Sequence, residues 1–443
     1  MALSGLDIYK VLPKTNCRDC GYPTCLAFAM QLAKKAVSLD KCPHLTQEAK
    51  QKLETAALPP IRLVKIGAGE KALEVGNETV MFRHEEKFHH PCGIGFILED
   101  SLSDTELEKN INLLKSLKFE RIGQVLSPDL VAISQTKSDK ERFLNILKKV
   151  RESLGFNLVL MSDKEDALKE ALEATKGTRP LIYAANSANY KMMADLAKSF
   201  GLPLAALADN LDDLAALVKN LNDLGVEDII LDSGTKPLTK KLADLTQIRR
   251  LSLKKNFRLL GYPTITQVLE KDPFKETINA GILLAKYSSI ILLNGLTAWQ
   301  ALSIFTLRQN IYSDPQKPLQ VEPKVYPIGK VSNASPVLVT TNFSLTYYTV
   351  LSEVESSKIG SYLISVDTEG MSVLTAWAAE KFTADKIVEA INKNNIGSLV
   401  SHKKIIIPGY VAVMSGDLED KSGCEVIVGP REAAGIPSFL KKL

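Results

Sequence analysis

Through residues 93–311, short apolar runs alternate with amphipathic stretches at a nearly constant spacing. The amphipathic stretches repeat apolar residues at helical spacing, and the apolar runs have the length of buried strands. A period of ~23–28 residues, repeated about eight times, predicts parallel βα units that close into a TIM barrel, with an open doubly wound sheet as the alternative. Strands are expected at 95–98, 123–126 or 130–133, 158–161, 181–184, 203–206, 229–231 and 290–293, with helices at 104–117, 140–154, 188–200 and 211–224.

The last part of the chain, residues 324–443, contains apolar runs that each end in small or polar residues. These runs lie at 336–342, 362–367, 405–409 and 426–430. In an open α/β sheet, the carboxyl ends of the strands form the ligand crevice. Strand ends rich in Gly, Thr, Ser and Ala suit a large, flat, amide-rich ligand, although ordinary βα turn chemistry explains them too. No G-x-x-x-x-G-K-[ST] loop occurs, which disfavours a nucleoside triphosphate.

Residues 61–92 alternate apolar and polar positions and predict short strands at 61–66, 72–75 and 79–82. The run G-A-G-E-K-A precedes strand-like residues, so it indicates a turn and not a dinucleotide site, which would open a helix. His84, His89, His90 and Cys92 also cluster here. The spacing H-E-E-K-F-H is one residue too long for the zinc motif H-E-x-x-H, so a polar loop is the better interpretation.

Composition is that of a globular protein of about three domains. Hydrophobic residues make up 45% of the chain and charged residues 24%, and the net charge is +4. No run of five basic residues occurs, which disfavours nucleic acid as a partner. Apolar stretches stay shorter than the ~18 residues of a membrane span, and the N-terminus does not resemble a signal peptide. No membrane partner is therefore expected. Six cysteines with four of them clustered do not look like a disulfide framework and fit a reducing cytoplasm, so a cytoplasmic protein is expected.

Four of the six cysteines lie close together near the N-terminus, as C-x2-C-x4-C-x16-C. They are Cys17, Cys20, Cys25 and Cys42. Gly21 and Pro23 favour a tight turn, and Thr24 is a predicted N-cap of a helix over 25–35 that places Cys25 in the first turn. One compact triplet with a distant fourth cysteine favours a 4Fe–4S cluster over zinc, which usually takes two short pairs. Packing cysteines are the remaining alternative, and His44 is interpreted as a bystander.

The predicted barrel contains no obvious catalytic constellation. No histidine occurs between residues 93 and 310. Asp232, Ser233, Gly234 and Asn294 follow predicted strands and either bind a ligand or, as we prefer, cap the following helices. A barrel without evident chemistry suggests a docking scaffold. Proline-rich segments at 58–60 and 312–323 indicate hinges, giving a cluster domain at 1–60, a linker at 61–92, the barrel at 93–311 and an α/β domain at 324–443.

Taken together, the four-cysteine motif, the barrel and the C-terminal sequences TTNFSLTYY, DTEGMSVLTAW and VGPREAAGIP resemble a known family. The chain is similar over its whole length to the large (gamma) subunit of the corrinoid iron–sulfur protein of the acetyl-CoA (Wood–Ljungdahl) pathway. The resemblance implies that the C-terminal Rossmann-like domain binds a cobalamin-type corrinoid. Matching the motifs places the corrinoid site at Thr340, Thr346, Gly370, Met371, Ser372, Val373, Thr375, Ala433 and Ala434.

The resemblance also implies the activity. The cobalt, as Co(I), accepts the methyl group of methyltetrahydrofolate from a methyltransferase and passes it to the nickel centre of acetyl-CoA synthase. The chain would act as a methyl carrier in anaerobic carbon dioxide fixation and not as a stand-alone catalyst. Expected partners are the small subunit, in a heterodimer, the methyltransferase, acetyl-CoA synthase/carbon monoxide dehydrogenase and a low-potential electron donor.

Histidine usage bears on the state of the cobalt. Many corrinoid enzymes replace the lower axial ligand of the cobalt with a histidine from a D-x-H-x-x-G motif. This motif is absent here, and His402 is the only histidine after residue 92. A base-off corrinoid without a histidine ligand is therefore expected, with the 4Fe–4S cluster returning Co(II) to Co(I). Two other functions remain open: an iron–sulfur electron-transfer component without corrinoid, and an assembly scaffold whose cysteines hold zinc.

Overall fold

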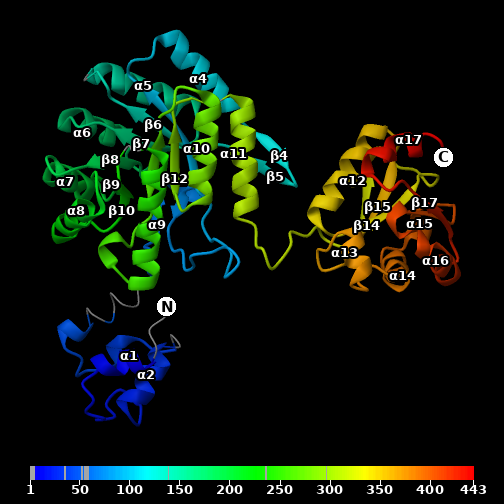
Figure 1. The fold of residues 1–443 in the computed structure, drawn as a ribbon, viewed down its shortest axis with the longest axis horizontal. Helices are drawn as coiled ribbons and strands as arrows, with labels where there is room; N and C mark the ends of the chain where they lie inside the picture. Colours follow the sequence, from blue (N-terminus) through cyan, green and yellow to red (C-terminus); the bar gives the residue numbers. More distant parts are fainter. Residues whose placement is uncertain are drawn as a thin grey trace. The chain divides into compact units, whose positions relative to one another are not determined.

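The structure is a computed structural model of the chain, and it describes residues 5–33, 36–50, 53, 59–137, 139–234, 237–295 and 297–443. The chain divides into two compact units (Figure 1). The first comprises Met1–Phe119 and Leu126–Tyr312, and the second Glu120–Val125 and Ser313–Leu443. Among the described residues, no helix is both long enough and apolar enough to cross a membrane.

The N-terminal segment is helical and has a small core of its own. Helices α1 (Gly5–Val11) and α2 (Cys25–Ala33) pack together through Ile8, Phe28 and Ala29. The Thr24 hydroxyl accepts the Ala27 N–H at 3.1 Å, which confirms the predicted N-cap. The predicted last two residues of this helix lie outside the described residues.

A β-hairpin of β1 (Val64–Ile66) and β2 (Leu73–Val75) follows. The 3-10 helix η2 (Gly69–Lys71) connects its strands, so the G-A-G-E-K-A run is a turn, as predicted. The hairpin packs into the same core as the inward side chains of the barrel. The strand expected at 79–82 is wrong. Its Met81 and Phe82 N–H groups bond to the Glu85 carboxylate and not to a neighbouring strand.

The middle of the chain forms a closed parallel barrel, which confirms the predicted fold class over the open sheet. A parallel bridge between Leu231 and Thr264 and a 2.8 Å bond from the Leu231 N–H to the Pro263 carbonyl close it. Its eight strands, in chain order, are β3 (Gly93–Glu99), β6 (Leu130–Ser134), β7 (Asn157–Met161), β8 (Leu181–Ala185), β9 (Leu204–Leu207), β10 (Ile229–Asp232), β11 (Ile265–Val268) and β12 (Ile290–Leu293).

Both alternative strands near residue 125 exist. The barrel strand is β6, whereas β5 (Gln124–Leu126) pairs with β4 (Phe119–Arg121) in a separate two-stranded sheet. Strand β11 was not predicted, because Thr266 and Gln267 interrupt its short apolar run. The other six predicted strands are confirmed, with ends shifted by up to two residues.

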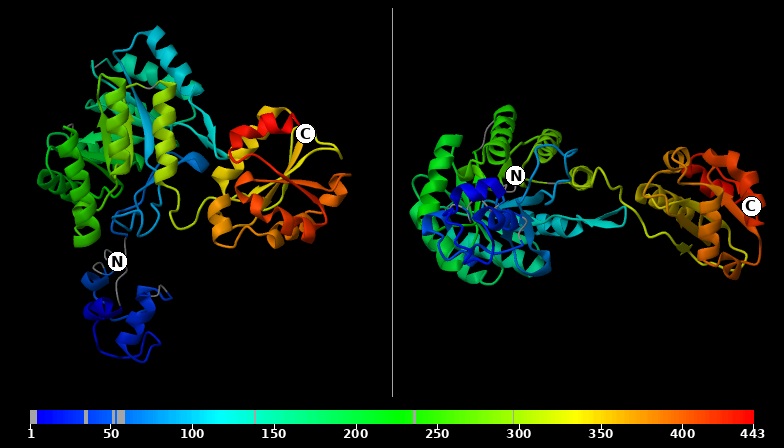
Figure 2. Two further views of the ribbon diagram at one scale, coloured as in Figure 1. Left: turned by 45° about the vertical axis from the view of Figure 1, so that its right-hand side comes forward. Right: turned by 90° about the horizontal axis from the view of Figure 1, so that it is seen from below.

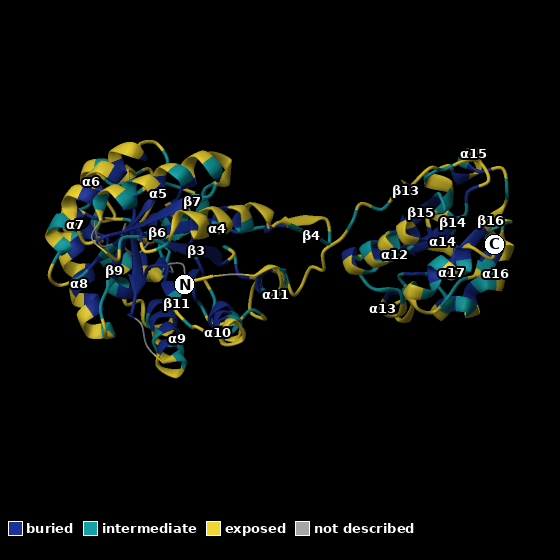
Figure 3. Ribbon diagram, turned by 90° about the horizontal axis from the view of Figure 1, so that it is seen from above, coloured by how far each residue is buried: buried dark blue, intermediate teal, exposed yellow. Residues whose placement is uncertain are grey.

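Helices surround the barrel and bury one face each, as Figure 3 shows by the exposed outer faces of the ribbons. The four predicted helices are confirmed with ends shifted by up to two residues, and the Ser103 capping box fixes the start of the first. The helices are α4 (Asp104–Ser116), α5 (Lys140–Ser153), α6 (Glu165–Ala174), α7 (Tyr190–Phe200), α8 (Leu211–Asp223), α9 (Leu238–Lys255), α10 (Pro273–Ala285) and α11 (Ala298–Ile311).

The C-terminal unit is built on a five-stranded sheet in the order β13-β15-β14-β16-β17. Figure 2 shows this sheet with helices packed around it. Only β13 (Val325–Ile328) is antiparallel. The parallel strands are β14 (Val337–Thr341), β15 (Ser361–Val366), β16 (Lys404–Ile407) and β17 (Glu425–Val428). The chain passes from β14 to β15 on one side and then to β16 on the other. This reversal creates a switch point at the carboxyl end of β14, where open α/β sheets bind ligands.

Helices cover both faces of this sheet over two separate apolar cores. They are α12 (Ser344–Ser357), α13 (Val373–Ala378), α14 (Ala384–Lys393), α15 (Ile396–Leu399), η4 (Gly409–Met414), α16 (Ser415–Ser422), η5 (Ala433–Gly435) and α17 (Ile436–Leu440). The architecture is therefore the predicted α/β arrangement of a small N-terminal segment, a TIM barrel and a Rossmann-like sheet.

Candidate functional site

The first three clustered cysteines lie on a loop whose backbone turns sharply. Asn16 and Arg18 adopt positive φ angles of 50° and 71°, and Gly21 one of 82°. The Asn16 carboxamide oxygen accepts the Cys25 N–H at 2.8 Å, and the Asn16 N–H donates to the Cys25 Sγ at 3.4 Å. Hydrogen bonds to cysteine sulfurs are a feature of iron–sulfur sites, where they tune the reduction potential of the cluster.

Cys17, Cys20 and Cys25 all lie close enough to Cys42 to act on its charge. Burial raises the pKa of Cys42, and the negative charges of Cys20, Cys17 and Cys25 raise it further. Cys25 is buried, Cys20 and Cys42 are half-buried, and Cys17 is exposed. Four converging thiolates, one of them with a backbone N–H donor, are a fitting ligand set for a 4Fe–4S cluster.

His44 lies beside this group, although the sequence indicated only a bystander. The Cys17 thiol, the Asp19 carboxylate and the His44 ring each offer a ligand atom, and these atoms lie within 4.8 Å of one another. The His44 Nε2 is engaged by Asp19 Oδ2 at 2.6 Å. A hydrogen bond with His44, and to a smaller extent one with Cys17, lowers the pKa of Asp19.

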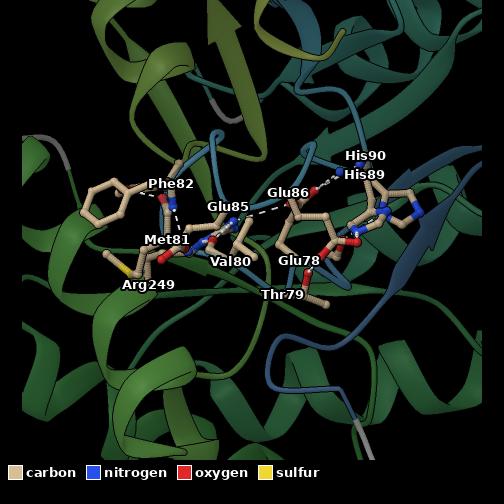
Figure 4. Close-up of polar contacts among 12 residues, drawn as sticks. Glu78, Thr79, Val80, Met81, Phe82, Glu85, Glu86, His89, His90 and Arg249 are labelled. Atoms are coloured by element: carbon tan, nitrogen blue, oxygen red, sulfur yellow. Dashed lines mark hydrogen bonds and ion pairs between the residues drawn. The ribbon is translucent and has the colours of Figure 1, made fainter. Parts of the chain in front are cut away.

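The histidine-rich segment after β2 is a polar loop organised around Glu78, as Figure 4 shows. The N–H groups of His89 and His90 both donate to Glu78 Oε1 at 2.9 Å, and Arg249 Nη2 lies 3.4 Å from Glu78 Oε2. The His90 ring contacts the Gly76 carbonyl at 2.7 Å. The contacts of this segment within the part of the chain that the structure describes are those of a polar loop, as interpreted from the sequence.

The polar residues at the barrel strand ends anchor loops. Buried Asp232 accepts hydrogen bonds from Lys241 Nζ and the Tyr183 hydroxyl, both at 2.7 Å, and from the Gly234 N–H at 2.9 Å. The Asn294 N–H donates to buried Glu276 at 3.0 Å. The preferred interpretation as helix caps is wrong, because the N-caps of α9 and α11 are Pro237 and Thr297. Ser233 is also buried.

In the C-terminal unit, three buried hydroxyls near the carboxyl ends of β14 and β15 lack a hydrogen-bond partner among the described residues. They belong to Thr340, Thr341 and Ser365. Thr340 and Ser365 are direct partners in the parallel register. Buried polar atoms are nearly always bonded, so these hydroxyls are free to bond a ligand or a water molecule.

The loop after β15 and the first turn of α13 contain five of the nine predicted ligand residues: Gly370, Met371, Ser372, Val373 and Thr375. Gly370 is buried with φ of 75°, a conformation that favours glycine. Ser372 precedes α13, and its hydroxyl lies 3.0 Å from that of Thr375. Met371 and Val373 are half-buried beside the C-terminal core.

Asn342, which sequence reasoning missed, holds this loop. Its buried carboxamide oxygen accepts the Thr368 N–H and hydroxyl, each at 3.0 Å, and the Gly370 N–H at 3.1 Å. Its Nδ2 donates to Asp367 at 3.1 Å and to Gln320 at 3.2 Å. The signal in the sequence was its place directly after a buried strand, within the T-T-N run.

Large apolar side chains are exposed just after the carboxyl ends of β14, β15 and β16. Helix α13 packs against η4, so the apolar residues after β15 and β16 are neighbours. The exposed residues are Leu345, Leu374, Trp377, Tyr410 and Val413. Exposed apolar patches of this kind mark binding sites.

The four other predicted residues lie at the same edge of the sheet. Thr340 is in β14, Thr346 is half-buried in the first turn of α12, and Ala433 and Ala434 form η5 after β17. Small residues, unbonded hydroxyls and an apolar rim fit a broad, largely apolar ligand with amide substituents, such as a corrinoid.

Fold and candidate sites define a multidomain α/β protein with a group of four cysteines near one end of the chain and a candidate ligand site near the other. A family model for the CO dehydrogenase/acetyl-CoA synthase delta subunit matches residues 63–440, and one for an Fe–S cluster matches residues 12–44. The corrinoid/iron-sulfur protein large subunit of Moorella thermoacetica is 47% identical over 100% of this chain and 99% of its own. The chain belongs to this family of corrinoid/iron–sulfur protein large subunits.

A second, more distant relative agrees with this assignment. The acetyl-CoA decarbonylase/synthase complex subunit gamma of Methanothermobacter thermautotrophicus is 36% identical over 100% of this chain and 99% of its own length. A solved dihydropteroate synthase from Thermus thermophilus aligns with 55% of this chain and 97% of its own, at 17% identity and a TM-score of 0.38. The barrel assignment itself rests on the strand order.

Proposed function

We propose that this chain is the methyl carrier of an acetyl-CoA synthase system, and that its C-terminal unit binds the corrinoid at the carboxyl edge of the sheet. The observation that carries the proposal is the coincidence, at one sheet edge, of unbonded buried hydroxyls with an exposed apolar rim. A bound corrinoid supplies a cobalt that accepts a methyl group as Co(I) and releases it to the next acceptor.

The residues of the chain bind, orient and shield this group. Thr340 and Ser365 offer hydroxyls to polar substituents of the ligand. Leu374, Trp377 and Val413 cover apolar ring surface and exclude water. Gly370 has no side chain, so the backbone of the β15 loop can approach the ligand closely.

Base-off binding without a histidine agrees with the place of His402. Its Nε2 contacts the Ser335 carbonyl at 2.9 Å, and its Nδ1 accepts the Lys404 N–H at 3.2 Å. His402 precedes β16 and Ser335 precedes β14, so both lie at the amino edge of the sheet, opposite the proposed site. Both ring nitrogens are therefore used away from the ligand.

Cys17, Cys20, Cys25 and Cys42 hold a 4Fe–4S cluster in this proposal, and such a cluster supplies single electrons at low potential. The division of labour is a cluster domain at 1–60, a linker at 61–92, the barrel at 93–311 and a corrinoid domain at 324–443. The partners are the small subunit in a heterodimer, a methyltetrahydrofolate methyltransferase, acetyl-CoA synthase/carbon monoxide dehydrogenase and a low-potential electron donor, all in the cytoplasm.

The proposal is tested by Cys20→Ala. In the pre-reduced protein this variant accepts methyl groups as the wild type does, because the corrinoid residues are intact. Once the cobalt is oxidised, a low-potential donor no longer restores methyl acceptance. Reactivation at the wild-type rate despite loss of iron would overturn the role of the cysteines. Cys424→Ala, which changes a cysteine outside the cluster, serves as the control.

A further inference from the structure

The end of the segment that connects the barrel to the C-terminal sheet is built into the ligand site. Residues 319–321 lie antiparallel to residues 342–344, and Gln320 bridges to Phe343. The Val321 N–H donates to the Asn342 carbonyl, and the Ser344 N–H donates to the Leu319 carbonyl, both at 2.9 Å. These three residues, here named the strap, thus add backbone pairing just beyond the carboxyl end of β14.

The side chain of Gln320 joins the strap to the β15 loop. Its Oε1 accepts the Asn342 Nδ2 at 3.2 Å, and the oxygen of the same carboxamide holds the Thr368 and Gly370 N–H groups. A Cβ built on Gly370 would lie 2.7 Å from the Gln320 Cγ and 3.0 Å from its Nε2, so the two residues are in close contact. Gln320 therefore restrains the loop both through Asn342 and directly.

We propose that the strap forms one wall of the ligand site and that Gln320 is a positioning residue, which fixes the β15 loop through Asn342. That the ligand at this wall is a corrinoid rests on the proposed function. The restraint on the loop does not depend on that function. Leu319 and Gln320 are exposed and stand free to meet a ligand. Any hinge of the connecting segment then lies upstream of the strap, within residues 313–318.

The restraint is tested by hydrogen exchange on the full-length, corrinoid-free chain, comparing Gln320→Ala with Gln316→Ala. Gln316 is an exposed glutamine of the same connecting segment and provides a matched control. Gln320→Ala is expected to speed exchange of the peptide containing Thr368 and Gly370 about fivefold, by weakening the hold of Asn342. Equal exchange in the two variants would overturn the restraint.

A double-mutant cycle tests the direct contact. Gly370→Ala introduces two unfavourable effects, backbone strain and a clash with the Gln320 side chain. Of these two effects, a second change Gln320→Ala relieves the clash and leaves the backbone strain. The loss of melting temperature caused by Gly370→Ala is therefore expected to be smaller in the Gln320→Ala background. Full additivity would contradict the contact.

Binding of hydroxocobalamin tests the wall. Gln320→Ala is expected to lower the affinity for hydroxocobalamin about fivefold relative to Gln316→Ala, because the loop is less well held. Unchanged affinity alongside faster exchange would overturn the wall but leave the restraint standing. A wild-type chain that binds no hydroxocobalamin would instead overturn the proposed function, while the exchange data would still judge the strap.

Discussion

The carboxamide oxygen of Asn342 accepts two hydrogen bonds from Thr368, one from the backbone N–H and one from the hydroxyl, each at 3.0 Å. Both residues are at most 1% exposed. The Met371 carbonyl also lies 3.0 Å from the Thr368 hydroxyl, so the single hydroxyl proton is shared between this carbonyl and the Asn342 oxygen. A single buried amide thus sets the path of the loop proposed to carry the corrinoid.

Replacing Asn342 by Ala is expected to destabilise the C-terminal unit by about 1–3 kcal/mol, because buried N–H groups lose their acceptor. The corrinoid content per chain falls with it. Chemical denaturation and cobalt analysis measure the two effects. Asn392→Ala removes an exposed carboxamide on α14 and serves as the control. Wild-type stability in Asn342→Ala would contradict the role assigned to this amide.

Breaking the buried ion pair of Arg249 and Glu78 is expected to destabilise the barrel unit strongly. Burial lowers the pKa of Arg249, and the Glu78 charge acts against that shift. Arg249→Met leaves the buried carboxylate without its cation, and the expected cost is about 3–5 kcal/mol. Urea denaturation measures it. The exposed neighbour Arg250 provides the control Arg250→Met, for which little change is expected.

Asp100 predicts a pH dependence of stability. Burial tends to raise its pKa, but hydrogen bonds from Thr136 and Lys137 outweigh burial, and the pKa lies below 3.8. Because the folded-state pKa is depressed, the stabilisation is complete well above 3.8 and is lost as pH falls through the folded-state pKa.

The stability difference between wild type and Asp100→Asn should therefore shrink as pH is lowered from about 6 towards 3. Denaturation midpoints over this range measure the trend. Asp163→Asn removes an exposed carboxylate just after β7 of the same barrel and should show a much flatter difference. If the wild type stayed more stable than Asp100→Asn by the same amount down to the lowest pH, the stabilisation could not come from the ionised Asp100 carboxylate.

The two cysteines outside the cluster should differ in reactivity. Cys92 is fully buried, and burial raises the pKa of its thiol far above the usual range. Cys424 is only half-buried. Brief treatment of the native protein with iodoacetamide should alkylate Cys424 and spare Cys92, because the exposed thiolate is the reactive species. Mass spectrometry of peptides reads the result, and labelling of both in urea is the control.

Local patterns in the sequence were enough to predict the barrel and the parallel strands of the C-terminal sheet. Periodic apolar runs report burial directly, whereas β11 is too short and too polar at Thr266 and Gln267 to stand out. The strand expected at 79–82 failed because its N–H groups bond to a side chain, Glu85, and alternation in the sequence does not report that.

The candidate sites divide in the same way. The cysteine centre could be predicted because its ligands lie close together in the sequence. The roles of Asn342 and Gln320 could not, because each depends on a contact with a segment brought near only by folding. The pair of Arg249 and Glu78 is a further example, since 171 positions separate its members.

The most direct test of the central claim is the iron and cobalt content of the chain purified without oxygen. The account predicts about four iron atoms and one corrinoid cobalt per chain, with the absorption spectrum of a base-off corrinoid. Iron without cobalt would contradict the methyl-carrier function and support an electron-transfer protein. Zinc without iron or cobalt would contradict both cofactor sites.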